Sequence, residues 1–295
     1  MGFLDHGPAL LFCPGDRPDR YAKAAAAADA VVLDLEDAVA PEAKARARSE
    51  VAGAVAEWGD RAVVRVNALG TPWHAADVAA MRRAGVRQLM LPKAQRPEEL
   101  ERLDDFEVVA LCESAAGVLN ARALAGSPHC AALFWGGEDL IADLGGRASR
   151  DAHGRYHPVV EQARSTVLLA AGEAGRPAID TVHIAIGDLE GVAQESVRAA
   201  DSGFRAKACI HPSHVPAIRA GFAPTEEQTA WAREVLAAAE SEAGVFVFRG
   251  RMIDAPLLAH ARAIAQARPG TEHPAHPHPH PHPHPHPHST THEGQ

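Results

Sequence analysis

Val31-Val32-Leu33-Asp34-Leu35-Glu36-Asp37 decides the fold: an apolar run ends in three acids within four residues. The run lacks polar alternation, which is typical of a parallel strand that is covered on both faces. In parallel α/β proteins, ligands and chemistry gather at the carboxyl ends of the strands. The acids could instead favour the positive end of a following helix. Because the same pattern of apolar strand and polar tip recurs along the chain, we favour the first interpretation.

The recurrence of this pattern predicts an α/β protein with a TIM (β/α)8 barrel, since eight apolar runs alternate with helical segments. The expected strands cover residues 9–13, 31–33, 62–66, 88–91, 108–112, 130–135, 179–185 and 206–210. We expect three parts in the chain: the barrel over residues 1–222, a C-terminal helical extension or lid over 223–268 and a disordered His-Pro tail over 269–295.

Composition excludes several classes of partner. The formal net charge of −9 argues against a nucleic-acid or membrane-surface protein, since both need a basic face. No apolar run approaches the roughly 20 residues that a membrane span needs, and the N-terminus lacks the pattern of a secretory signal. The four cysteines form no CxxC pair, which favours a reducing compartment. We therefore expect a cytoplasmic protein.

A barrel would bring the polar strand tips to one rim, including Glu36, Lys93 and His211. Glu113 and Asp139 follow neighbouring strands, and two carboxylates are the usual protein ligands of Mg²⁺. We expect the 136–138 segment to contact substrate, because glycine lets backbone N–H groups approach a carboxylate closely; its members are Gly136, Gly137 and Glu138. These features predict a metal-dependent barrel enzyme for a small keto or hydroxy acid.

Two groups of cations have both a functional and a structural interpretation. Arg65 lies between valines, where burial needs an anionic partner: Glu36 or Asp37, a substrate carboxylate, or both. Arg17 and Lys23, with Arg20 between them, could grip a phosphate at a strand tip or be solvated surface charges.

The C-terminal segment alternates His and Pro from 276 to 288, which predicts a polyproline-like, disordered tail. Closely spaced imidazoles bind transition metals. The tail therefore has either a metal-handling role or no role in the activity.

Eight ordered motifs resemble the citrate lyase β-chain-like group of the HpcH-HpaI aldolase family, which includes malyl-CoA and citramalyl-CoA lyases and related thioesterases. The resemblance covers residues 8–267. The motifs are PGDRPDRYAKA (14–24), VVLDLEDAV (31–39), VRVN (64–67), MLPKA (90–94), CESAAGVLNA (112–121), WGGEDLIADLGG (135–146), GFRAKACIHPSHV (203–215) and GRMIDAPLL (250–258).

The resemblance implies a Mg²⁺-dependent, homotrimeric lyase that cleaves β-hydroxyacyl-CoA esters reversibly to an acyl-CoA and an α-keto acid, with possible thioesterase activity. Glu113 and Asp139 would hold the metal, and Arg65 would clamp the substrate carboxylate. Glu36 and Asp37 would orient Arg65 and metal-bound water. Arg17 and Lys23 would bind the phosphates of coenzyme A, and His211 would line the coenzyme A side of the site. Asp254 would act from the C-terminal lid of a neighbouring subunit.

Three other functions stay open from the sequence. The chain could be the β subunit of a citrate lyase complex that acts on a carrier-protein thioester. It could also be a metal-dependent aldolase for free acids, without coenzyme A. The last alternative is a metal-binding protein dominated by its His-Pro tail.

Overall fold

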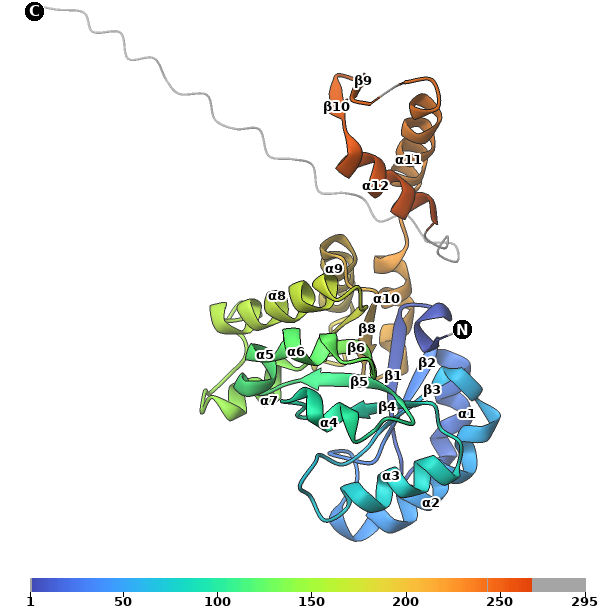
Figure 1. Ribbon diagram of the computed structural model, residues 1–295, viewed down its shortest axis with the longest axis vertical. Coiled ribbons are helices and arrows are strands. Elements are labelled where there is room, and N and C mark those ends of the chain that lie inside the picture. Colours follow the sequence, from blue (N-terminus) through green and yellow to red (C-terminus); the bar gives the residue numbers. More distant parts are fainter. Residues whose placement is uncertain (1, 243, 267–295) are drawn as a thin grey trace, which may run out of the picture.

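The computed structural model describes residues 2–242 and 244–266, and its centre is a closed barrel of eight parallel strands in sequence order (Figure 1). This confirms the predicted (β/α)8 barrel. The strands are β1 Ala9–Pro14, β2 Ala30–Asp34, β3 Ala62–Arg65, β4 Gln88–Leu91, β5 Glu107–Cys112, β6 Cys130–Trp135, β7 Ala178–Asp180 and β8 Ala206–Cys209.

Helices surround the barrel and connect its strands. The α-helices are α1 Pro18–Ala27, α2 Lys44–Ala54, α3 His74–Arg83, α4 Pro97–Glu101, α5 Ala115–Leu119, α6 Ala121–Gly126, α7 Gly137–Asp143, α8 Pro158–Glu173, α9 Leu189–Ser202 and α10 Val215–Phe222. Short 3-10 turns complete the connections: η1 Phe3–Asp5, η2 Pro41–Ala43, η3 Val55–Glu57, η4 Gly59–Arg61 and η5 Pro212–His214.

The core has two shells, which explains why the strands are apolar on both faces. Alternate strand residues such as Val32 and Met90 fill the barrel interior. Their neighbours, such as Val31 and Leu89, pack outward against the helices. Since side chains alternate along a strand, a sheet covered by helices buries both sets.

The predicted strand over residues 179–185 is the main error in the strand assignment. β7 ends at Asp180, and the following segment is a loop in which Ile184 and Ile186 are exposed. The apolar residues of this loop are therefore not buried between the barrel and the helices, as they would be in a strand.

The C-terminal extension folds around a small core of its own. It contains α11 Glu226–Ala239, β9 Phe246–Phe248, β10 Arg251–Ile253 and α12 Ala255–Gln266. The Thr225 hydroxyl caps α11 by accepting a hydrogen bond from the backbone N–H of Gln228. The buried residues are Ala232, Val235, Phe246, Ile253 and Ala261.

This extension stands beyond α10, clear of the barrel (Figure 1). Within residues 2–242 and 244–266, no hydrogen bond or ion pair joins residues 224–266 to the barrel. The predicted His-Pro tail, residues 269–295, lies outside the described part of the chain. None of the described helices is long and apolar enough to cross a membrane.

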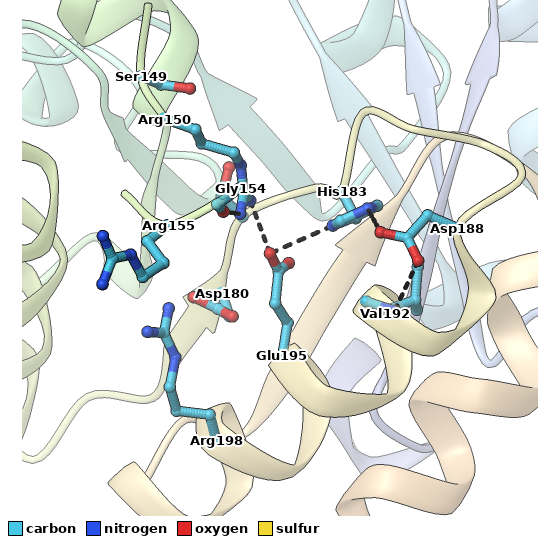
Figure 2. A network of polar contacts seen from close by, with 12 residues as sticks. Ser149, Arg150, Gly154, Arg155, Asp180, His183, Asp188, Val192, Glu195 and Arg198 are labelled. Atoms are coloured by element: carbon cyan, nitrogen blue, oxygen red, sulfur yellow. Dashed lines mark hydrogen bonds and ion pairs between the residues drawn. The ribbon is translucent and has the colours of Figure 1, made fainter. Parts of the chain in front are cut away.

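A buried ionic network holds the loop after β7, residues 181–188, through contacts to Lys207 on β8 and Glu195 on α9. Lys207 is 1% exposed, and its Nζ donates to the Thr181 carbonyl at 2.6 Å and to Glu195 at 3.0 Å. Figure 2 shows the Glu195 carboxylate between the Arg150 guanidinium and the His183 imidazole. Burial opposes ionisation of Glu195, but His183, Lys207 and Arg150 outweigh it and hold its pKa well below the usual range.

We expect Lys207→Met to lower the free energy of unfolding by about 3 kcal/mol or more, because the buried carboxylates of Asp180 and Glu195 would lose a shared cation. Urea denaturation measures the change. Lys23→Met is the matched control, since Lys23 is exposed on α1 and its loss should change stability by at most about 0.5 kcal/mol. A loss below about 1 kcal/mol for Lys207→Met would contradict the assigned role of the network.

Candidate active site at the carboxyl ends of the strands

Five charged side chains meet where the first strands of the barrel end. Arg65 is the last residue of β3, and Glu36, Lys93 and Glu113 follow β2, β4 and β5. Asp139 lies in the first turn of α7, after β6. Ion pairs connect these residues, so the structure brings together side chains that the sequence analysis places on one rim.

Arg65 is held mainly by Asp34, which is not among the predicted site residues. Its Nε and Nη2 donate to the two Asp34 carboxylate oxygens at 2.7 Å each. The two residues are direct partners in the β2–β3 register, and this register is the signal that could have identified the pair. Burial opposes the charge of Arg65, but Asp34, Glu36 and Glu113 outweigh it and raise its pKa.

The guanidinium of Arg65 keeps donors for a ligand. Of its five N–H groups, two bond to Asp34. Nη1 lies 3.2 Å from Glu36 Oε2, an ion-pair contact that is out of line with the N–H, so this buried oxygen has no hydrogen-bond partner among the described residues. Three N–H groups of Arg65 therefore form no hydrogen bond with the described residues, and they could donate to a carboxylate.

Lys44 is a second residue without a predicted role, and it positions the Glu36 loop. It is 6% exposed, and its Nζ donates to the carbonyls of Leu35 at 2.8 Å and Glu36 at 2.6 Å. The ammonium also lies over the Trp73 ring. A buried ammonium that bonds two consecutive carbonyls fixes the backbone that carries Glu36.

Lys93 joins the acids through both its backbone and its side chain. Its φ of 53° is unusual for a residue other than glycine. In this conformation its backbone N–H donates to Glu113 Oε1 at 2.9 Å, and its Nζ donates to Glu36 Oε1 at 2.7 Å. Burial opposes the charge of Lys93, but Glu36 and Glu113 raise its pKa above the usual range.

Glu113 is buried against Gly136, and this contact requires glycine. A Cβ at position 136 would lie 2.9 Å from Glu113 Cβ and 3.0 Å from its Oε2. Burial raises the pKa of Glu113 to about 8, and the charges of Asp139 and Glu36 add to the shift. Burial likewise raises the pKa of Glu36, partly offset by Arg65 and Lys93.

The excess of negative charge fits a divalent cation. Four carboxylates face two cations, Arg65 and Lys93, so a divalent ion would balance the cluster; the carboxylates are those of Asp34, Glu36, Glu113 and Asp139. Within the described residues, no group of three or more His, Cys, Asp or Glu side chains is placed to hold a metal. Two carboxylates, with water and substrate as further ligands, are how Mg²⁺ is commonly held.

The other residues expected near the substrate are placed differently. Asp37 is exposed, and no hydrogen bond or ion pair with Arg65 is found in the described structure. The Gly136 N–H donates to the Cys112 carbonyl at 3.3 Å, so it is used by the barrel. Gly137 is buried at the start of α7, and the Glu138 carboxylate accepts a hydrogen bond from Ser149.

The residues expected near coenzyme A follow β1 and β8 and do not form one cluster, and the expected lid residue lies apart from them. Arg17 precedes α1 and pairs with Asp19, while Lys23 is exposed on α1. His211 follows β8, and its Nδ1 lies 2.7 Å from Ser213 Oγ. Asp254 follows β10 in the extension, so a single chain does not bring it to the rim (Figure 1).

Comparison with known proteins gives consistent results over most of the chain. The model of the family HpcH/HpaI aldolase/citrate lyase matches residues 9–212. A citrate lyase subunit beta-like protein of Mycobacterium tuberculosis is 47% identical over 90% of this chain and 96% of its own. A mitochondrial citramalyl-CoA lyase of Mus musculus is 32% identical over 87% of this chain and 84% of its own. A (3S)-malyl-CoA thioesterase of Cereibacter sphaeroides is 33% identical over 88% of this chain and 96% of its own.

A solved structure shows the same fold with ligands. It is the crystal structure of protein CitE from M. tuberculosis in complex with magnesium, acetoacetate and coenzyme A. The TM-score is 0.85 at 45% identity, covering 90% of this chain and 98% of that chain.

The raised pKa of Glu113 predicts a pH dependence of stability. The folded state binds the proton of Glu113 more tightly than the unfolded chain does, so its contribution is present below pH 4.5 and is lost as the pH rises through about 8. In EDTA, the stability of the wild type relative to Glu113→Gln should fall over this window, by on the order of a few kcal/mol. Chemical denaturation at several pH values measures this difference, and a difference that is constant with pH would contradict the assignment.

Proposed function

The chain belongs to the HpcH/HpaI aldolase/citrate lyase family, and on this basis we propose that it is a Mg²⁺-dependent lyase of β-hydroxyacyl-CoA esters. Substrates of the malyl-CoA, citramalyl-CoA or citryl-CoA type would be cleaved reversibly to an acyl-CoA and an α-keto acid. The observation that carries the proposal is the rim cluster: Lys93 contacts Glu113, Asp139 and Glu36, and Glu36 in turn contacts Arg65, which donates only two N–H groups to the described residues.

In this proposal, each rim residue has a defined task. Glu113 and Asp139 hold Mg²⁺, which when bound lowers the pKa of a substrate hydroxyl and polarises the carbonyl that forms from it. Arg65 binds the substrate carboxylate through the N–H groups that Asp34 leaves free. Glu36 orients both Arg65 and Lys93, and Asp37 is the proposed contact to ordered water. Gly136 leaves the space that Glu113 needs, while Gly137 and Glu138 border the substrate.

Asp254 is the proposed acid–base residue. In cleavage, the Asp254 carboxylate takes up the proton of the substrate hydroxyl, and the C–C bond breaks so that its electron pair forms the enolate of the acyl-CoA. The protonated Asp254 carboxyl then donates its proton to the enolate carbon. In condensation, the Asp254 carboxylate removes that proton again.

We propose that Asp254 comes from a neighbouring copy in a homotrimer. The extension of a single chain stands clear of its own barrel and exposes apolar side chains on the β9–β10 hairpin, with Val247 74% and Met252 61% exposed. Exposed apolar residues on a protruding hairpin favour contact with another surface. A lid supplied in this way would exclude water when it closes.

The coenzyme A ester is proposed to extend from the rim across the strand ends of β1 and β8. Arg17 and Lys23 would face its phosphates, and His211 would border its path. The ligands of the M. tuberculosis structure, magnesium, acetoacetate and coenzyme A together, support this class of substrate. The four free, buried cysteines support a reducing compartment such as the cytoplasm.

Thioester hydrolysis is the second candidate, because the lyase and the thioesterase relatives are 32% and 33% identical to the chain. Identity therefore does not separate the two activities. The names of the mycobacterial relatives also keep open a β subunit that acts on a carrier-protein thioester.

The test is product analysis with malyl-CoA and citramalyl-CoA, in Mg²⁺ and in EDTA. We expect Mg²⁺-dependent acetyl-CoA formation, reduced at least about 100-fold in Glu113→Ala because removal of a metal ligand removes its chemistry. Release of free coenzyme A without acetyl-CoA would instead indicate hydrolysis. Turnover of neither ester, with turnover of a carrier-protein thioester, would indicate the β-subunit role.

The shared site predicts complementation between two inactive variants. Glu113→Ala and Asp254→Ala should each be inactive as pure proteins. After unfolding and refolding together, mixed trimers contain sites with both native residues, so part of the wild-type activity should return. Activity that stays at the level of the separate variants, in mixtures shown to be hetero-oligomeric, would contradict a lid from the neighbouring copy.

A further inference from the structure

The Lys93 ammonium occupies the place where the carboxylates of the rim converge. Its Nζ lies 2.7 Å from Glu36 Oε1, 3.6 Å from Asp139 Oδ1 and 4.0 Å from Glu113 Oε1. Two of these three carboxylates are the proposed metal ligands. The same charge therefore neutralises the groups that a divalent cation would use.

This position is fixed by the backbone of Lys93. The residue adopts the left-handed conformation, with φ at 53°, which is unfavourable for a residue that carries a side chain. In return, its N–H bonds to Glu113 Oε1 at 2.9 Å, and Pro92 precedes it at the end of β4. The backbone thus ties Lys93 to one proposed metal ligand while its side chain faces the other.

We propose that Lys93 is an internal counter-ion that competes with the divalent cation for Glu113 and Asp139. This inference rests on the metal site of the proposed function. Lys93 stabilises the metal-free cluster and weakens metal binding, because an incoming cation must displace the ammonium from both carboxylates.

The structure provides a route for this displacement. The Lys93 side chain is 40% exposed and has a flexible four-carbon stem, so the ammonium can move toward solvent while the backbone bond to Glu113 is kept. Its strongest contact is with Glu36, which is not a proposed ligand. The lysine can therefore leave Asp139 and Glu113 without losing every anionic partner.

Calorimetric titration of the EDTA-stripped, dialysed protein with MgCl₂ and MnCl₂, without any CoA ester, tests the proposal. Lys93→Met should bind each ion at least about tenfold more tightly than the wild type, since a cation within about 4 Å of a divalent site repels it strongly. Lys93→Gln should behave alike, and Lys93→Arg, which keeps the charge, should stay within about threefold of the wild type. Arg83→Met is the control, because Arg83 is exposed at the end of α3, which leads to the start of β4 and not to a carboxyl strand end.

Thermal unfolding gives a second measurement that does not depend on activity. In EDTA, Lys93→Met should melt several degrees below Arg83→Met, and saturating Mg²⁺ should raise its Tm by more than it raises that of the wild type. Equal or weaker metal binding in both Lys93→Met and Lys93→Gln would overturn the competition while leaving the metal site intact. If neither the wild type nor any variant binds Mg²⁺ or Mn²⁺, the proposed metal site fails together with this inference.

Discussion

The bidentate ion pair between Asp34 and Arg65 is the interaction on which the rim depends. It joins β2 to β3 in register, at the point where the barrel meets solvent. Both side chains are largely buried, so neither charge would be tolerated without the other. Asp34 Oδ1 also accepts a hydrogen bond from the backbone N–H of Glu36 at 2.8 Å. This bond orients the Glu36 carboxylate toward Arg65 and Lys93. The pair thus orients the arginine and the acid beside it in one arrangement.

The barrel could be predicted because its strands are apolar on both faces, and only the run after Asp180 misleads, since its isoleucines are exposed. The rim was predicted as a set of strand tips. The ion pairs within the rim could not be predicted. Any of the three acids at 34, 36 and 37 could pair with Arg65, and the choice depends on the register between β2 and β3, which are distant in sequence. The contacts of Lys44 and Lys93 could not be predicted for another reason. Their long side chains reach carbonyl and carboxylate oxygens that no local sequence pattern indicates.

The carboxylates of the rim destabilise the folded chain by their mutual repulsion, and the same carboxylates are the proposed ligands of the metal. More carboxylates than cations share a buried space, and the consequence is the raised pKa of Glu113. The left-handed conformation of Lys93 and the glycine at position 136 are the local devices that allow this crowding. The same cluster is incomplete with respect to the proposed chemistry in a single chain, because Asp254 lies in an extension that stands clear of the barrel. Catalysis by this design would therefore depend on assembly as well as on folding.

The most direct measurement for the central claim is anomalous diffraction from a crystal grown with Mn²⁺. We expect one strong peak at the rim, within about 2.0–2.6 Å of a carboxylate oxygen of both Glu113 and Asp139, with Lys93 Nζ withdrawn from them. A crystal with no peak at the rim, or with Mn²⁺ held only by residues elsewhere in the chain, would contradict the central claim.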